Sequence, residues 1–354
     1  MNPRYAVEGR RHAVLTEGFL TEVHGKTAHG VLRYRPEQVV AVVDSKYAGK
    51  RVCDVIPSLR SEAPIVASVG EALKYGPHSL LIGFATDGGA IPAGLRAPVL
   101  EAIDAGLDVV SGLHEVLADD PEIAARAASK GVALVDVRVP PPRIPLFGGA
   151  VYRERRPIVL AVGSDCAVGK MTAMLEIERA ARENGQKAEF IATGQTGILI
   201  TGKGIAVDRV IADFVTGAAE QLVLSADPDA CVLLVEGQGS IFHPAYAPVT
   251  FGLLYGCAPD ALLLCHRPGL RNVLGFAQAV PDLRTLVEMH ERIVSFVKPA
   301  RVIGVVLDTS ALDEDGAREA IAQAQEETGL PADDPVRNGG TKMWRTLEGL
   351  LVPR

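Results

Sequence analysis

The chain has 354 residues, of which 48% are hydrophobic, 22% charged and only 5% aromatic, and its formal net charge is −7. This length predicts two domains, and the composition is that of a globular protein rather than a disordered or fibrous one. The acidic balance argues against a general nucleic-acid or membrane-surface protein, so we expect neither nucleic acid nor membrane as a partner.

Cysteine usage and the N-terminal residues narrow the class further. The five cysteines are irregularly spaced and form no Cys-x-x-Cys pair, which indicates neither a zinc site nor a disulfide framework. The N-terminus lacks the apolar run of a signal peptide, and no stretch reaches the ~18 apolar residues of a membrane helix. We therefore expect a cytoplasmic enzyme that acts on a small molecule, has no assigned metal site and forms a homo-oligomer.

Short apolar runs alternate with helical patterns over the first 145 residues. Strands are expected at 39–44, 63–66, 79–83, 108–112 and 131–137, and helices near 69–75, 94–106 and 123–130. This alternation predicts a parallel sheet that is covered by helices on both faces. None of the glycine-containing loops reads Gly-x-Gly-x-x-Gly, so a nicotinamide cofactor is not indicated.

A proline-rich stretch separates the two halves of the chain. Residues 139–145 read VPPPRIP, and prolines at this density make a stiff extended linker. We therefore place an N-terminal domain at residues 1–145 and a C-terminal domain at residues 146–354.

Residues 157–173, PIVLAVGSDCAVGKMTA, form the most informative stretch of the chain. An apolar strand pattern, a glycine loop ending in Gly-Lys and a helical pattern follow one another, as in a phosphate-binding loop. Backbone N–H groups, the helix N-terminus and the Lys170 ammonium would surround the anion. The predicted phosphate-binding residues are Gly163, Ser164, Asp165, Cys166, Ala167, Val168, Gly169, Lys170, Met171 and Thr172.

This loop departs from the common phosphate-loop pattern in two ways. Five residues separate Gly163 from Gly169, a spacing that resembles dethiobiotin synthetase, and Met171 replaces the hydroxyl residue that usually follows the lysine. Methionine offers no ligand to Mg²⁺, and Thr172 lies about 100° further round the helix. The pattern thus favours a bound phosphate over a cleaved triphosphate, with a simple glycine-rich turn as the alternative.

Polar residues follow the next two predicted strands, at 187–192 and 230–235. Thr193, Gln195 and Thr196 come after the first, in a polar glycine-rich turn at 193–197 that is suited to binding a small substrate. Glu236 ends the second, where a phosphate-loop site places the carboxylate that holds Mg²⁺ or a catalytic proton. His243 follows shortly and is either a general base or a structural loop residue.

Two arginines follow the predicted strand at 261–265. Arg267 and Arg271 carry guanidinium groups suited to a substrate carboxylate or phosphate, with a pair of solvated side chains as the alternative. The predicted catalytic residues are accordingly Glu236, His243 and Lys170, and the predicted substrate-binding residues are Thr193, Gln195, Thr196, Arg267 and Arg271.

Five segments together resemble the DgcN-type D-glutamate N-acetyltransferase family: PIVLAVGSDCAVGKMTA, FIATGQTG, ADFVTGAAE, LLVEGQGSIFHPAY and LLCHRPGLRN. The resemblance implies an α/β protein with a Rossmann-like N-terminal sheet and a P-loop C-terminal sheet. It also implies transfer of acetyl from acetyl-CoA to the amine of D-glutamate, with the phosphate loop holding the CoA phosphates. Glu236 or His243 would then be the base, and Arg267 and Arg271 would bind the carboxylates of glutamate.

Two other functions fit the same residues. An ATP- and Mg²⁺-dependent ligase or kinase of the dethiobiotin synthetase type would use Glu236 to hold Mg²⁺ and Lys170 to stabilise the transferred phosphate. A nucleotide-binding regulator without turnover would use the loop alone, although the many polar residues at strand ends favour an enzyme.

Overall fold

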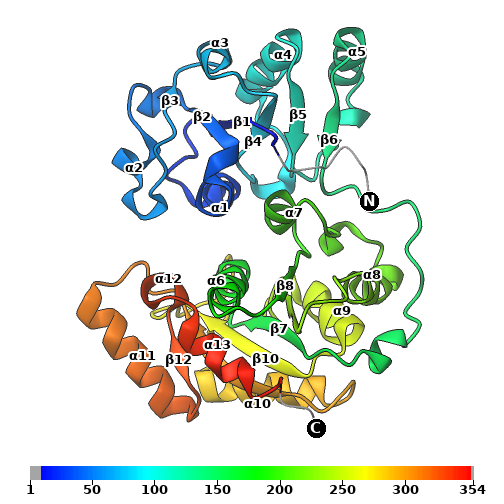
Figure 1. Ribbon diagram of the computed structural model, residues 1–354, viewed down its shortest axis with the longest axis vertical. Coiled ribbons are helices and arrows are strands. Elements are labelled where there is room, and N and C mark those ends of the chain that lie inside the picture. The colour runs from blue at the N-terminus through cyan, green and yellow to red at the C-terminus, as the bar shows by residue number, and fades with distance from the viewer. Residues whose placement is uncertain (1–8, 352–354) are drawn as a thin grey trace. The chain divides into compact units, whose positions relative to one another are not determined.

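The structure, a computed structural model that describes residues 9–351, divides into two compact units (Figure 1). Unit 1 comprises the residues up to Pro141 together with Gly194–Arg209, and unit 2 comprises Pro142–Thr193 and the residues from Val210 onward. Each unit is built on a six-stranded sheet. The predicted α/β class with two parallel sheets is confirmed. No helix within residues 9–351 is long and apolar enough to cross a membrane.

Unit 1 has the strand order β3-β2-β1-β4-β5-β6, and every neighbouring pair is parallel. This order is that of the Rossmann fold, so the Rossmann-like prediction for the N-terminal half is confirmed. The strands are β1 (His12–Leu15), β2 (Val39–Val43), β3 (Ile65–Val66), β4 (Ser79–Ile82), β5 (Asp108–Ser111) and β6 (Leu134–Asp136). The helices are α1 (Lys26–Tyr34), α2 (Val52–Val55), α3 (Val69–Ala72), α4 (Arg96–Asp104), α5 (Pro121–Lys130) and α7 (Gln195–Thr201).

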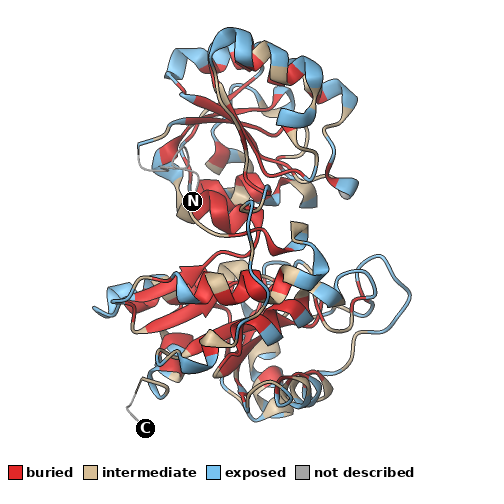
Figure 2. Ribbon diagram, turned by 90° about the vertical axis from the view of Figure 1, so that its right-hand side faces the viewer, coloured by how far each residue is buried: buried red, intermediate tan, exposed pale blue. Residues whose placement is uncertain are grey.

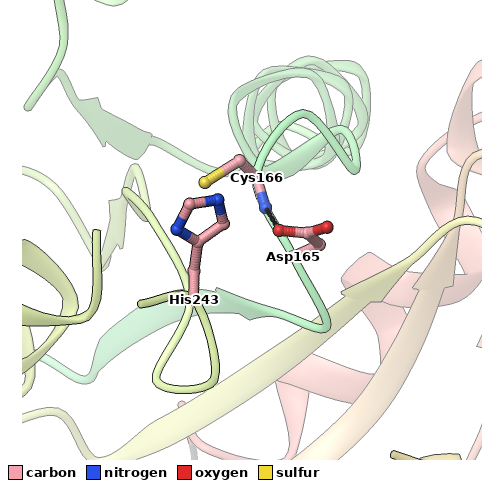
Figure 3. Close-up of side chains that lie close together, drawn as sticks. All are labelled: Asp165, Cys166 and His243. Atoms are coloured by element: carbon pink, nitrogen blue, oxygen red, sulfur yellow. Dashed lines mark hydrogen bonds between the residues drawn. The ribbon is translucent and has the colours of Figure 1, made fainter. Parts of the chain in front are cut away.

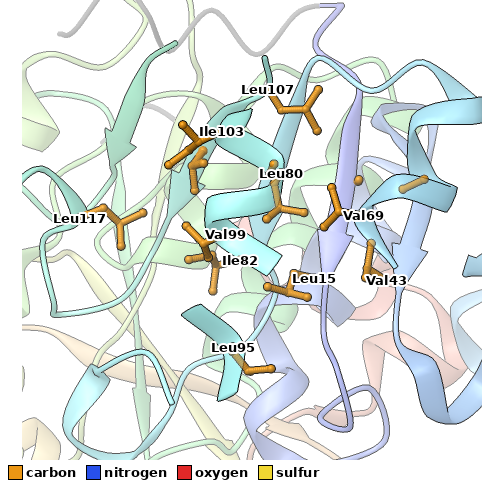
Figure 4. Packing of buried hydrophobic residues seen from close by; sticks show 14 of the residues in the cluster. Leu15, Val43, Val69, Leu80, Ile82, Leu95, Val99, Ile103, Leu107 and Leu117 are labelled. Carbon is orange, nitrogen blue, oxygen red and sulfur yellow. The ribbon is translucent and has the colours of Figure 1, made fainter. Parts of the chain in front are cut away.

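Aliphatic side chains fill the core of unit 1, as the low aromatic content predicts. Val69 of α3 and Val99 and Ile103 of α4 pack with Leu80 and Ile82 of the central strand β4 (Figure 4). All five are almost fully buried. Parallel strands that are covered on both faces read as continuous apolar runs, which explains the sequence pattern in this half.

One acidic residue at a strand end in unit 1 has a structural role. Asp44 follows β2 and is fully buried. Its Oδ2 accepts hydrogen bonds from Thr16 Oγ1 (2.9 Å) and the Gly18 N–H (3.0 Å), and its Oδ1 accepts from the Lys46 N–H (3.2 Å). Asp44 therefore ties together the loops that follow β1 and β2.

The segment 194–209 belongs to unit 1 although it follows the phosphate loop in sequence. Its helix α7 neighbours α1: Gln195 Nε2 donates to Thr27 Oγ1 (2.6 Å), and Arg35 Nε donates to the Ile200 carbonyl (2.6 Å). The predicted glycine-rich turn at 193–197 is therefore wrong from Gln195 onward, because these residues open a helix. The boundary predicted between residues 145 and 146 stays a prediction about domains.

Unit 2 has the strand order β12-β11-β10-β7-β9-β8, again with all neighbours parallel. The strands are β7 (Ile158–Gly163), β8 (Ala188–Ile191), β9 (Val232–Val235), β10 (Ala261–His266), β11 (Arg301–Leu307) and β12 (Ala332–Asp333). The helices are α6 (Lys170–Glu183), α8 (Ala212–Leu224), α9 (Ala247–Cys257), α10 (Leu283–Val294), α11 (Glu314–Thr328), α12 (Pro335–Asn338) and α13 (Thr341–Glu348).

The central strand β7 positions the phosphate loop. All six of its residues are buried, and the strands of the sheet form the buried interior of the unit (Figure 2). β7 lies between β9 and β10. After β7 the chain forms β8 and β9 on one side of it and then crosses to form β10 on the other side. In open parallel sheets ligands bind beyond the carboxyl ends of the strands at such a switch point. A ligand site is therefore expected in the loops that follow β7, β9 and β10.

A buried glutamate anchors the segment that follows the prolines to unit 2. Glu220 on α8 is 5% exposed and accepts hydrogen bonds from the N–H groups of Gly148 (2.6 Å) and Val151 (3.1 Å). We expect Glu220→Ala to destabilise unit 2 by about 2–3 kcal/mol, because two N–H groups lose their acceptor in a poorly hydrated place.

Denaturant unfolding followed by tryptophan fluorescence measures this effect, since the chain's one tryptophan, Trp344, is buried in α13 of unit 2. Glu319→Ala, a change of the same residue type on the surface helix α11, is the control and should leave the midpoint unchanged. An unchanged midpoint in Glu220→Ala would show that the anchor contributes nothing.

Candidate active site

The loop between β7 and α6 has the backbone of an anion cradle. Gly169 (φ 87°) and Ala167 (φ 53°) adopt left-handed conformations, and α6 begins at Lys170. A Cβ atom on Gly163 would lie 2.9 Å from Val168 Cγ2 and 3.0 Å from Lys170 Nζ, so any larger residue would require these side chains to shift. The first N–H groups of a helix point at such a loop and favour a negative charge there.

Lys170 folds back into its own loop. Its side chain is buried, and Nζ donates to the Asp165 carbonyl (2.7 Å). Burial lowers the pKa of Lys170, while a negative charge on Cys166 or on the Glu236 carboxylate acts in the opposite direction. An anion bound in the loop would replace the carbonyl as partner of the ammonium and would favour its charged form.

Met171 and Thr172 occupy the first turn of α6, and both are half-buried. The position that follows the lysine thus holds a thioether, a poor ligand for a hard cation such as Mg²⁺. The loop offers the N-terminus of α6 and the Lys170 ammonium to an anion. It has no hydroxyl at the position after the lysine, where P-loop proteins usually hold Mg²⁺.

Glu236 follows β9 and is only 4% exposed. Its Oε2 accepts a hydrogen bond from the Thr193 N–H (2.9 Å), and Thr193 Oγ1 donates to the Glu236 carbonyl (2.8 Å). A Cβ atom on Gly237 would lie 1.8 Å from the Ala161 carbonyl oxygen and 2.9 Å from Lys170 Cδ. The strand end that carries Glu236 therefore runs directly against β7 and the phosphate-loop lysine.

His243 is buried, and both of its ring nitrogens are hydrogen-bonded. Nδ1 accepts from the Ala245 N–H (3.2 Å), so the neutral ring carries its proton on Nε2, which lies 3.2 Å from the Leu274 carbonyl oxygen. The ring also packs against Tyr246 and Phe276. These contacts are those of a positioned residue, and a role as general base would require one of the two hydrogen bonds to break.

Asp165, Cys166 and His243 form a side-chain cluster at the phosphate loop (Figure 3). A carboxylate oxygen, the thiol sulfur and a ring nitrogen all lie within 4.8 Å of one another. The Asp165 carboxylate accepts from the Cys166 N–H and the Leu274 N–H, both at 2.6 Å. Carboxylate, thiolate and imidazole are also the ligand types that zinc prefers.

The two predicted carboxylate-binding arginines have different surroundings. Arg267 donates twice to Asp308 Oδ2 (3.0 and 2.6 Å) and once to the Ala167 carbonyl of the phosphate loop (2.8 Å). Burial acts to raise the pKa of Asp308, but hydrogen bonds from Ser310 and Arg267 outweigh it and hold this pKa below its usual value. Arg271 is exposed. Arg267 therefore braces the loop through Ala167 and Asp308, whereas the guanidinium group of Arg271 makes no such hydrogen bond to the described loop residues 163–172.

We expect Arg267→Ala to lower kcat/KM for both substrates roughly three- to tenfold, the scale of one net hydrogen bond, because the loop loses a brace. Arg271→Ala is the matched comparison and should raise the KM of the acceptor alone. Steady-state kinetics with each substrate varied in turn measures both effects. An effect of Arg267→Ala confined to the acceptor would show instead that Arg267 binds the acceptor directly.

Gln195 and Thr196 do not lie in unit 2 with Thr193. Both belong to unit 1, where they are buried and the Gln195 amide donates to Thr27 Oγ1 and Thr196 Oγ1. Their predicted role in substrate binding stays a prediction.

His266 is a functional candidate that the sequence analysis did not single out. It ends β10, and its Nδ1 lies 2.9 Å from Ser164 Oγ of the phosphate loop. Burial lowers the pKa of His266 to about 4, so the ring is neutral at pH 7. A polar residue at the end of an apolar run is the same signal that indicated Glu236, and His266 links β10 to the loop.

Comparison with known proteins gives the family. Residues 145–344 match a family model described as the P-loop domain of a domain of unknown function, DUF1611, and residues 45–140 match its Rossmann-like N-terminal domain. The chain belongs to the DUF1611 family. A crystal structure of a DUF1611 protein from Anabaena variabilis is 37% identical, with a TM-score of 0.92 over 96% of this chain and 99% of that one.

Two curated proteins that are similar to the present chain carry the name D-glutamate N-acetyltransferase. The one from Tritonibacter scottomollicae is 37% identical over 320 residues, which cover 90% of this chain and 92% of the relative. The one from a Pseudoalteromonas species is 37% identical over 277 residues, which cover 77% of this chain and 82% of the relative. The membership predicted from the sequence motifs is confirmed.

Proposed function

We propose that this protein is an N-acetyltransferase that moves the acetyl group of acetyl-CoA to the amine of an acidic amino acid, D-glutamate. The names of the two relatives support this activity, since the similarity extends over most of both chains. The geometry of unit 2 supports it independently, because the reaction needs a base for the amine and hydrogen-bond donors for the developing oxyanion.

The observation that carries the proposal is the meeting of an anion cradle and a buried carboxylate at one edge of the sheet. Lys170 and the loop N–H groups form the cradle, and Glu236 lies at the neighbouring strand end with its charge acting on Lys170. The cradle suits a phosphate or an oxyanion, and the carboxylate suits removal of a proton from an amine. We assign the base to Glu236 rather than to His243, whose ring nitrogens are both engaged.

The family resemblance implies that the phosphate loop holds the phosphates of CoA, and this assignment stays a prediction. Acetyl-CoA carries its phosphates at one end and its thioester at the other, with the whole pantetheine arm between them. The loop can therefore hold either the phosphates or the reacting end of an extended donor. Variants of Lys170 distinguish these two cases, as described below.

An ATP- and Mg²⁺-dependent ligase or kinase is the second candidate, because the strand order and the loop-helix unit are those of a P-loop protein. Met171 weighs against it, since the residue after the lysine usually supplies a hydroxyl to Mg²⁺. Calorimetry with acetyl-CoA and with ATP·Mg²⁺, each titrated separately, compares the two candidates. We expect binding of acetyl-CoA, and binding of ATP·Mg²⁺ alone would contradict the proposal.

The substitution Met171→Ser tests the metal question within the loop. We expect it to leave acetyl transfer within about threefold of wild type, because the proposed reaction needs no metal ligand at that position. Product formation with and without added Mg²⁺ is the measurement, and Met171→Leu controls for the loss of the thioether. A Mg²⁺-dependent gain of activity in Met171→Ser would favour the phosphoryl-transfer function.

A further inference from the structure

We propose that Cys166 carries the acetyl group as an S-acetyl thioester between the two substrates. The cluster formed by Cys166 with Asp165 and His243 motivates this proposal, because it sets a thiol among charged and hydrogen-bonding groups at the mouth of the phosphate loop. The proposal rests on the proposed acetyl transfer and adds a covalent intermediate to it. From the sequence, Cys166 is predicted only as one of the phosphate-binding residues.

Cys166 has the surroundings of a reactive cysteine. It is half-buried, whereas Cys257 and Cys265 are fully buried and burial raises the pKa of each thiol to about 12. It precedes the N-terminus of α6 by four residues, and a thiolate at this position would favour the charged form of Lys170. Helix N-termini and neighbouring cations favour the thiolate, which is the nucleophilic form of cysteine.

The backbone of one residue, Leu274, contacts both side chains beside Cys166. The Leu274 N–H donates to Asp165 Oδ2 (2.6 Å), and the Leu274 carbonyl accepts from His243 Nε2 (3.2 Å). The second Asp165 oxygen accepts the Cys166 N–H (2.6 Å) and so fixes the backbone that carries the thiol. Asp165 and His243 are therefore positioning residues, and Cys166 is the reacting group.

In the first half-reaction the Cys166 thiolate attacks the carbonyl carbon of acetyl-CoA. The bond from this carbon to the CoA sulfur breaks, and CoA leaves as a thiolate that takes up the proton Cys166 gave up. The oxyanion formed in between is stabilised by the loop N–H groups and by Lys170. One thioester is exchanged for another, so the step needs no further reactant.

In the second half-reaction the neutral amine of the acceptor attacks the acetyl carbon on Cys166. The bond from this carbon to the cysteine sulfur breaks, an amide bond forms, and Cys166 returns as a thiolate. The surplus proton on nitrogen passes to Glu236, whose strand end lies against Lys170. The reacting end of acetyl-CoA must therefore reach the loop, and its phosphates bind outside it.

Mass spectrometry of the full-length protein after incubation with acetyl-CoA, without an acceptor, tests the proposal. We expect one added acetyl group, located on Cys166 by peptide mapping and released by D-glutamate. We also expect exchange of labelled CoA into acetyl-CoA without an acceptor, and ping-pong kinetics. Cys166→Ser and Cys166→Ala should abolish both labelling and exchange and lower kcat at least about a hundredfold, while Cys53→Ser should behave as wild type.

Formation of N-acetyl-D-glutamate by Cys166→Ala at a near-normal rate would overturn the proposal and leave the proposed function standing. Acetylated Cys166 that is not released by D-glutamate would support the cysteine step and count against the acceptor. Stoichiometric zinc in the purified protein, lost in Cys166→Ala, would also overturn the proposal, because Cys166 would then be a metal ligand. Circular dichroism and the Trp344 fluorescence of each variant establish that it is folded.

Discussion

Glu236→Gln is expected to lower kcat at least about a hundredfold while leaving the affinity for acetyl-CoA unchanged. Removal of a general base typically costs about 10²- to 10⁴-fold in rate. The amide keeps an oxygen that accepts the Thr193 N–H, so the loop contacts of the strand end should persist. The effect should therefore appear in the rate of transfer and not in folding.

Glu189→Gln is the matched control for this variant. Glu189 is also a buried strand glutamate that accepts a backbone N–H, from Asp227 (2.5 Å), but it lies near the start of β8. It should keep wild-type kcat. A wild-type kcat in Glu236→Gln would exclude Glu236 as the base and leave His243 and His266 as the histidines next to the loop.

Lys170→Ala is expected to lower kcat/KM for acetyl-CoA at least tenfold, which corresponds to ~1.5 kcal/mol for a lost hydrogen bond to a charged group. The ammonium is the one side-chain cation that folds into the loop within the described residues 163–172. Lys170→Met keeps most of the buried stem and should show the same loss, which separates the charge from packing.

The division of this loss between KM and kcat identifies what the loop holds. A loss in acetyl-CoA affinity indicates that CoA phosphates occupy the loop, since they are bound before the reaction. A loss in kcat at unchanged affinity indicates the oxyanion, which exists only in the transition state. Unchanged kcat and unchanged affinity in a folded Lys170→Ala variant would remove the loop from the proposed site.

The local features of the fold could be predicted from the sequence because each depends on neighbours along the chain. The apolar run 158–162, the glycines and Lys170 predicted a strand, a loop and a helix in this order. The structure has β7 and α6 at these positions, with the loop between them. Glu236 could be expected beside the loop, because parallel strands end at the same edge of a sheet.

Individual side-chain partners far apart in sequence could not be predicted. Thr193–Gly197 has the composition of a turn, but Gln195 opens α7 and bonds to Thr27, which lies 168 residues earlier. The sequence predicted that Arg267 binds the substrate. Its pairing with Asp308 could not be predicted, because it depends on the ends of two adjacent strands, β10 and β11, lying together. The cluster around Cys166 depends on the backbone N–H and carbonyl of Leu274, which no sequence pattern marks.

The most direct measurement is product formation by the wild-type protein from acetyl-CoA and D-glutamate alone, without ATP and in the presence of a metal chelator. Mass spectrometry detects the acetylated product, and a thiol assay measures the released CoA. We expect N-acetyl-D-glutamate and free CoA in equal amounts. Absence of product until ATP and Mg²⁺ are added would contradict the account and favour a phosphoryl-transferring ligase or kinase.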